Sequence, residues 1–200
     1  MITLDLEQGG PEWFAARAGI PTASNFDKII TTKGEPSKSA KKYMYQLAGE
    51  RILGAPVETY TNGAMERGIA LEAEAREMYG LTTGNEVRQV GLCYQNEERC
   101  FSCSPDGLTD IGGLEIKCPL LSTHVGYLLK GKLPTEYFQQ VQGSLFVTGL
   151  SWWDFFSYYP GMPPFRVRVT PDELFHNALG AALSSFCSEL DNTVDFLRSK

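Results

Sequence analysis

The chain of 200 residues has only two histidines, His124 and His176, and five cysteines without regular spacing. An odd and irregular set of cysteines does not fit a disulfide framework, so we expect free thiols in a reducing compartment. Cys100 and Cys103 form one CxxC, but no second CxxC follows at the spacing of a zinc ribbon. The sequence therefore predicts buried thiols near a strand rather than a structural zinc or a redox motif.

Long apolar runs are also missing, and residues 1–5 are not a basic stretch followed by an apolar one. A membrane span and a secretory signal peptide are therefore not expected, and a cytoplasmic location is. Apolar and aromatic residues make up 42% of the chain, which is ample for a buried core. Because no internal repeat or low-complexity linker is visible, we predict a single domain over residues 1–200.

Basic residues are fewer than acidic ones, 18 against 24, so the net charge is −6. This excludes a protein that coats nucleic acid through bulk positive charge. It does not exclude a nucleic-acid enzyme, which can surround metal ions with carboxylates and confine its basic residues to one surface. Residues 28–42 carry five lysines and one glutamate, a local charge of +4. This segment fits a solvated surface and a phosphate-contacting surface equally well.

Helical periodicity and capping residues predict helices in the first and last parts of the chain, with strands between them. The predicted helices are a short one opening at residues 11–13, then 22–30, 39–53, 63–79, 122–129, 135–147 and 171–200. The predicted strands are 86–94, 101–104, 113–117, 152–159 and 165–169. This order predicts an α/β fold with a central mixed β-sheet flanked by helices.

The stretch richest in chemistry is Ser104-Pro105-Asp106-Gly107-Leu108, followed by Leu114-Glu115-Ile116-Lys117-Cys118-Pro119. Alternate side chains of a strand share a face, so Glu115 and Lys117 point together and Ile116 points to the opposite, apolar side. A hairpin-like return across the Gly-rich turn would place Asp106 beside Glu115. Two carboxylates can hold a hard divalent cation, and the ammonium of Lys117 can act on a bound water.

These two blocks and three others, in the same order, resemble the PD-(D/E)xK nuclease superfamily. More narrowly, they resemble the phage lambda exonuclease and viral alkaline exonuclease family. The other blocks are Trp13, Arg17 and Gly19 with Thr22-Ala23-Ser24, then Gly68 with Glu72, and Tyr137 with Gln140-Val141-Gln142. The resemblance spans residues 10–160 and implies a restriction-endonuclease-like core.

Carried over residue by residue, the resemblance implies a centre with two Mg²⁺ ions, in which Mn²⁺ could substitute. The implied ligands are Glu72, Asp106, Glu115 and the backbone carbonyl of Ile116. Lys117 would orient or deprotonate the attacking water, and Gln140 would help to hold that water. Arg17, Ser24 and Ser104 match family positions that bind a terminal 5′-phosphate, which suits the bidentate fork of an arginine and hydroxyls near a helix N-terminus.

The resemblance further implies a Mg²⁺-dependent exonuclease that digests the 5′-ended strand of duplex DNA to mononucleotides and leaves a 3′ overhang. It implies a homotrimeric ring around DNA, which would keep an acidic protein on a polyanion. It also implies a single-strand annealing protein as recombination partner and a phage or prophage gene expressed in a bacterial cytoplasm.

The individual site residues and the function as a whole each have alternative interpretations. Glu72 can form an i,i+4 ion pair with Arg76, Ser24 can merely cap its helix, and Arg17 can merely cover Trp13. Gln140 and Gln142 flank Val141 on one helix, so only one of them should face the site. An endonuclease of the same superfamily would share the carboxylates without gripping a DNA end. A catalytically silent DNA-end or partner-binding module would need none of the charged cluster.

Overall fold

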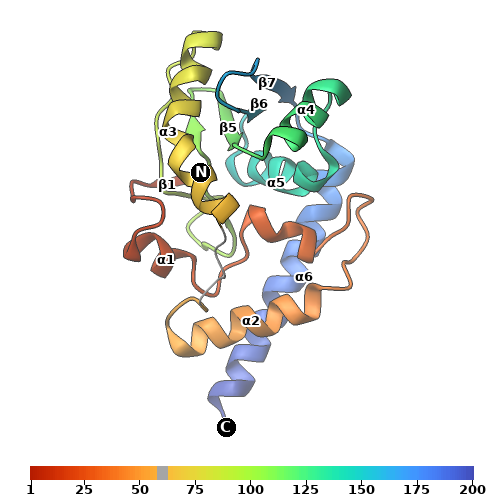
Figure 1. Cartoon of the computed structure of the whole chain (residues 1–200). Coiled ribbons are helices and arrows are strands. Elements are labelled where there is room, and N and C mark those ends of the chain that lie inside the picture. The colour runs from red at the N-terminus through yellow and green to blue at the C-terminus, as the bar shows by residue number, and fades with distance from the viewer. Residues whose placement is uncertain (58–62) are drawn as a thin grey trace.

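The structure is a computed structural model that describes residues 1–57 and 63–200 (Figure 1). Its helices are α1 (Pro11–Arg17), α2 (Ala40–Leu53), α3 (Gly63–Thr83), α4 (Leu121–Lys130), α5 (Phe138–Thr148) and α6 (Glu173–Arg198), with the 3-10 helices η1 (Ala23–Lys28) and η2 (Thr135–Tyr137). Its strands are β1 (Ile2–Leu4), β2 (Leu92–Tyr94), β3 (Ser102–Cys103), β4 (Gly107–Leu108), β5 (Gly112–Lys117), β6 (Trp152–Ser157) and β7 (Phe165–Val169).

The strands form two sheets. One is antiparallel, in the order β1-β2-β3, and the other has the order β4-β5-β6-β7. In the second sheet β5 and β6 run parallel, while β4 and β7 pair antiparallel at the two edges. The expected α/β fold with a mixed sheet is therefore confirmed.

The β4-β5-β6-β7 sheet is covered on both faces, and Figure 1 shows α3 on one side of it and α4 and α5 on the other. Leu114, Ile116 and Phe156 belong to the core on the α3 side, together with Ala75 of α3. Trp153 and Phe155 point the other way, into the larger core that also contains residues of α2, α5 and α6. The alternation expected for β5 is therefore present, and Ile116 is buried opposite Glu115.

Two predicted elements differ from the structure, and two observed strands were not expected. Of residues 86–94 only β2 pairs regularly, because Arg88 makes an isolated bridge to Leu108 instead. Residues 22–30 form the shorter 3-10 helix η1, and Thr22 makes no side-chain cap to it. Strands β1 and β4 were not expected, since two or three residues are too few for an alternation to be read. The remaining predicted helices and strands are present, with ends that shift by a few residues.

The structure also bears on two features considered from the sequence, the cysteines and the membrane-spanning potential of the helices. All five cysteines are free, as predicted, and Cys103 is fully buried in β3, but Cys100, just before that strand, is only half-buried. No described helix has the length and apolar character needed to span a bilayer.

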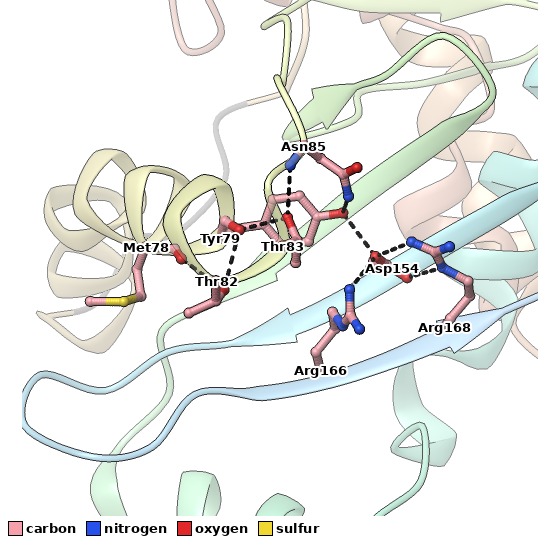
Figure 2. A network of polar contacts seen from close by, with 8 residues as sticks. All are labelled: Met78, Tyr79, Thr82, Thr83, Asn85, Asp154, Arg166 and Arg168. Atoms are coloured by element: carbon pink, nitrogen blue, oxygen red, sulfur yellow. Dashed lines mark hydrogen bonds and ion pairs between the residues drawn. The ribbon is translucent and has the colours of Figure 1, made fainter.

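A buried carboxylate fastens α3 to the sheet (Figure 2). Asp154 of β6 is 0% exposed, accepts a hydrogen bond from the Tyr79 hydroxyl at 2.8 Å, and receives two from Arg168 at 2.8 and 2.9 Å. Arg166 lies 3.7 Å away on the same side. Burial and the bond to Asp154 raise the pKa of Tyr79 to about 12, so its hydroxyl stays a donor. Because α3 also carries Glu72, this network holds one wall of the site described below.

We expect Tyr79→Phe to lower the free energy of unfolding by about 1.5–3 kcal/mol, the usual contribution of a hydrogen bond to a charged group. Arg168 still pairs with Asp154 in this variant, so the fold should persist. Tyr45 is 55% exposed, and Tyr45→Phe is the matched control, expected to change stability by less than about 0.5 kcal/mol. Urea denaturation of both variants measures the difference. Equal stabilities would mean that the Tyr79 hydroxyl contributes nothing to holding α3.

Candidate functional site

The β4–β5 hairpin brings Asp106 beside Glu115. Gly107 pairs with Leu114 across the two strands, and the Asp106 amide donates to the Leu114 carbonyl at 3.0 Å. The Asp106 side chain then turns along β5, where its Oδ2 accepts the Ile116 amide at 2.5 Å. The return expected from the Gly-rich turn is therefore present, and it sets the Asp106 carboxylate at the start of the Glu115-Ile116-Lys117 segment.

Glu115 is the most buried carboxylate of the cluster, at 2% exposure. Its Oε1 contacts the Lys117 ammonium at 2.5 Å and accepts from the Gln140 amide of α5 at 2.6 Å. Gln142 turns away, donating to the Thr170 carbonyl at 2.9 Å and accepting the Asp172 amide at 3.0 Å. Only one of the two glutamines faces the site, as the helical spacing predicted.

The charges of this cluster perturb one another. Burial and repulsion from Glu115 raise the pKa of Asp106 well above its ordinary value, although Lys117 opposes this shift. Burial alone would lower the pKa of Lys117, but attraction to Glu115 and Asp106 outweighs it and leaves that pKa raised. The negative charges of the cluster therefore outweigh the positive charge of Lys117. The same negative charges keep Lys117 protonated.

Glu72 reaches the same place from α3, through an arginine. Arg76 pairs with Glu72 at 2.5 Å and also donates from its Nε to the Asp106 carbonyl at 2.8 Å. The i,i+4 ion pair considered from the sequence thus forms, and it lies beside the cluster, since the Glu72 charge contributes to the raised pKa of Asp106. From the sequence, Arg76 was expected only as the ion-pair partner of Glu72. The structure shows that it also binds the backbone of Asp106.

A divalent metal fits part of this arrangement. Among the described residues no three His, Cys, Asp or Glu side chains are arranged to hold one ion together, and Glu72 is engaged by Arg76. However, no described residue donates to Oδ1 of Asp106 or to Oε2 of Glu115. These two carboxylate oxygens lie where negative charge is in excess. Carboxylate oxygens are the ligands that hard cations such as Mg²⁺ prefer.

A second group of predicted residues meets around Arg17. Its Nη1 donates to the Ser104 hydroxyl at 2.6 Å, and its Nη2 lies 3.4 Å from the Ser24 hydroxyl and 3.5 Å from that of Thr22. The guanidinium stacks 4.1 Å from the centre of the Trp13 ring. Arg17 therefore does cover Trp13, but its charged end points at three hydroxyl groups rather than into solvent.

Arg17 has no acidic partner in the part of the chain that the structure describes. Burial lowers its pKa, and the Glu50 carboxylate, which forms no ion pair with it, opposes this shift only in part. A half-buried guanidinium whose described hydrogen bonds all go to hydroxyls is a ready site for an anion. Because Ser104 lies two residues before Asp106 in the chain, this anion site adjoins the carboxylate cluster.

Two further residues hold the anion site in place. The Trp13 indole donates to the Gly91 carbonyl at 2.8 Å and to the Ser104 hydroxyl at 3.2 Å. Gly19 has a left-handed φ of +69° and packs against Arg51, where a Cβ would lie 2.2 Å from the Arg51 side chain. Its amide donates to Glu50 at 2.9 Å, which ties the end of α1 to α2. Both residues belong to the blocks that carried the family resemblance.

Sequence reasoning missed some contacts of the site. Thr22 joins the anion site, and its position two residues from Ser24 was the available signal. Gln8 donates to the carbonyls of Val90 and Pro105 at 2.9 and 2.8 Å and so supports the segment before Asp106. No local pattern marks Gln8, because its partners lie more than eighty residues away along the chain.

Comparison with known proteins gives results that agree with this geometry. A crystal structure of an alkaline exonuclease from Laribacter hongkongensis superimposes with a TM-score of 0.85 and 36% sequence identity, covering 95% of this chain and 97% of that one. The same figures hold for that protein in complex with dAMP. A phage-related exonuclease from Haemophilus somnus 129PT shares the fold, with a TM-score of 0.68, 15% identity and coverage of 89% and 96%.

No curated relative matches the chain significantly. The family model of the YqaJ-like viral recombinase domain matches residues 12–151, which is more than half of the chain. This match and the similarity to the alkaline exonuclease confirm the resemblance found in the sequence. The chain belongs to the family of YqaJ-like viral recombinase domains.

Proposed function

We propose that residues 1–200 form one exonuclease domain that digests the 5′-ended strand of duplex DNA to mononucleotides, leaving a 3′ single strand. The observation that carries the proposal is the position of Ser104. It bonds to the unpaired guanidinium of Arg17 and lies two residues before Asp106, so an anion site adjoins a carboxylate cluster. A terminal phosphate held at Arg17 would place the next internucleotide linkage over the carboxylates.

In this proposal Asp106 and Glu115 hold divalent metal, with the Ile116 carbonyl and Glu72 as further oxygens. To do so, Glu72 would give up its ion pair with Arg76 and bind the metal ion instead. Two Mg²⁺ ions, or Mn²⁺ in their place, would lower the pKa of a water and neutralise charge on the phosphate. The chain's own groups position the reactants. Lys117, whose raised pKa keeps it protonated, would orient the water, and Gln140, whose amide donates to Glu115, would help to hold that water.

Family membership supports recombination of viral or prophage DNA in a bacterial cytoplasm as the setting. The Laribacter hongkongensis relative is an exonuclease and binds dAMP, a mononucleotide of the kind that this reaction would release. The proposal includes a homotrimeric ring around DNA and a single-strand annealing protein as partner. A ring would explain how a chain with a net charge of −6 stays on a polyanion.

The experiment that tests the proposal compares duplex ends. We expect 5′-phosphorylated linear duplex to be degraded at least about tenfold faster than 5′-hydroxyl duplex, since one hydrogen bond to a charged group contributes about 1.5–3 kcal/mol. Closed circular duplex should remain intact. Arg17→Ala should erase the preference for the phosphate, because the guanidinium is its charged partner. Release of nucleotides from uniformly labelled DNA, with and without Mg²⁺, measures all three.

Arg198 of α6 is exposed, and Arg198→Ala is the matched control, in which the phosphate preference should stay intact. If Arg17→Ala slows both substrates equally and keeps the preference, Arg17 is structural and the end is recognised elsewhere. Cleavage of the closed circle would instead favour an endonuclease of the same fold. No Mg²⁺-dependent product at all would favour a silent DNA-end binding module.

A further inference from the structure

A pocket of about 520 Å³ opens beside Arg17, between α1, η1 and α2. Its apolar lining includes Trp13, Phe14, Tyr43, Leu47 and Val57. This volume lies within the range of small-ligand sites, which run from about 300 to 1,000 Å³. Neither the carboxylate cluster nor Ser104 lines it, so the pocket extends from Arg17 along α1 and α2 rather than toward β4 and β5.

The electrostatics of the pocket restrict what can enter it. Glu50 lines it and is 5% exposed, with one carboxylate oxygen bound to the Gly19 amide and the other to the Gln46 amide, both at 2.9 Å. A second phosphate beyond Arg17 would therefore meet a buried carboxylate. A neutral group with an aromatic face would instead meet the exposed Phe14 ring, on which a nucleobase can stack, beside the apolar parts of Trp13 and Leu47.

We infer that this pocket binds one unpaired nucleoside on the 5′ side of the phosphate held by Arg17. The inference rests on the proposed function and extends it to DNA ends that lack a terminal phosphate. On such an end the first internucleotide phosphate, a diester with one negative charge where a terminal phosphate carries nearly two, occupies the Arg17 site more weakly, and the first nucleoside enters the pocket. The strand thereby shifts by one nucleotide, and the second internucleotide linkage lies over the carboxylates.

This shift changes the first product. Water adds its oxygen to the phosphorus of the second linkage, the bond from that phosphorus to the 3′ oxygen of nucleotide two breaks, and that oxygen takes up a proton. The released fragment is a dinucleoside monophosphate with free 5′ and 3′ hydroxyls. The remaining strand now begins with a 5′-phosphate on nucleotide three, so every later product is a mononucleotide.

The test uses the full chain, Mg²⁺ and a 5′-hydroxyl duplex whose first internucleotide phosphate carries a radioactive label. We expect the label to appear in a dinucleoside monophosphate. A labelled mononucleotide would show that the first linkage was cut and would overturn the inference, as would the absence of any labelled product. A 5′-phosphorylated duplex in a parallel reaction separates the two proposals, because failure to degrade it contradicts the proposed function itself.

A variant that fills the pocket provides the second measurement. Val57 and Ile52 are each 46% exposed, and only Val57 lines the pocket. Val57→Trp should slow release of the dinucleoside monophosphate by about tenfold or more, while 5′-phosphorylated duplex is degraded within about twofold of the wild-type rate. Ile52→Trp should leave both rates unchanged. Equal slowing of both substrates by Val57→Trp, or slowing of neither, would contradict a nucleoside site.

Discussion

Replacing Asp106 with Asn is expected to abolish Mg²⁺-dependent cleavage, with a loss of at least about 10³-fold in kcat. The Asn side chain can still accept the Ile116 amide, so the local backbone should hold, but the charge that retains the divalent ion is gone. Glu115→Gln should have the same effect, and Asp106→Ala and Glu115→Ala should be equally inactive. Steady-state cleavage of 5′-phosphorylated linear duplex measures the loss.

Two controls separate loss of the site from loss of the fold. Asp110 is exposed in the β4–β5 turn, and Asp110→Asn should cleave at the wild-type rate. Because burial and Glu115 raise the pKa of Asp106, the folded protein without metal disfavours its charge. Asp106→Asn should therefore unfold at the same or a higher temperature than wild type in EDTA. Cleavage by Asp106→Ala within about tenfold of wild type would contradict the assignment of the cluster.

Lys117→Ala is expected to lower kcat by about 10²–10⁴-fold while changing DNA affinity little. The ammonium lies 2.5 Å from Glu115 and 5.2 Å from the centre of the Tyr137 ring, in the wall of the site. One ammonium adds little to the binding of a long polyanion, but it acts on charge that develops in the transition state. Single-turnover cleavage gives the rate of the chemical step, and a binding titration in Ca²⁺ gives the affinity.

The matched control for Lys117 is Lys130, an exposed residue at the end of α4. Lys130→Ala should leave both the rate and the affinity unchanged. A Lys117→Ala protein with a normal kcat and a raised KM would show that the side chain is a phosphate contact, and its role toward water would then be wrong.

The sequence by itself determined the local structure of this protein, that is, its helices, its turns and the side chains that share a face of one strand. Alternation in β5 predicted that Glu115 and Lys117 share a face, because successive side chains of a strand must point in opposite directions. Short-range rules also predicted the helix that carries Glu72 and the turn that returns Asp106 to β5. The family resemblance depended on short motifs of the same kind, and the matches to known proteins bear it out.

Only the tertiary structure decided which distant residues meet. Arg17 and Ser104 are 87 positions apart, and Gln140 and Glu115 are 25 apart, so no periodicity connects them. Arg76 joins Glu72 to the backbone of Asp106 only because α3 lies across β5, where Tyr79 and Asp154 hold it. Helical spacing showed that one of Gln140 and Gln142 faces the site, the family resemblance pointed to Gln140, and the packing of α5 sets Gln140 against Glu115. Side-chain periodicity describes one element at a time, whereas a site built from several elements depends on how their apolar faces pack together.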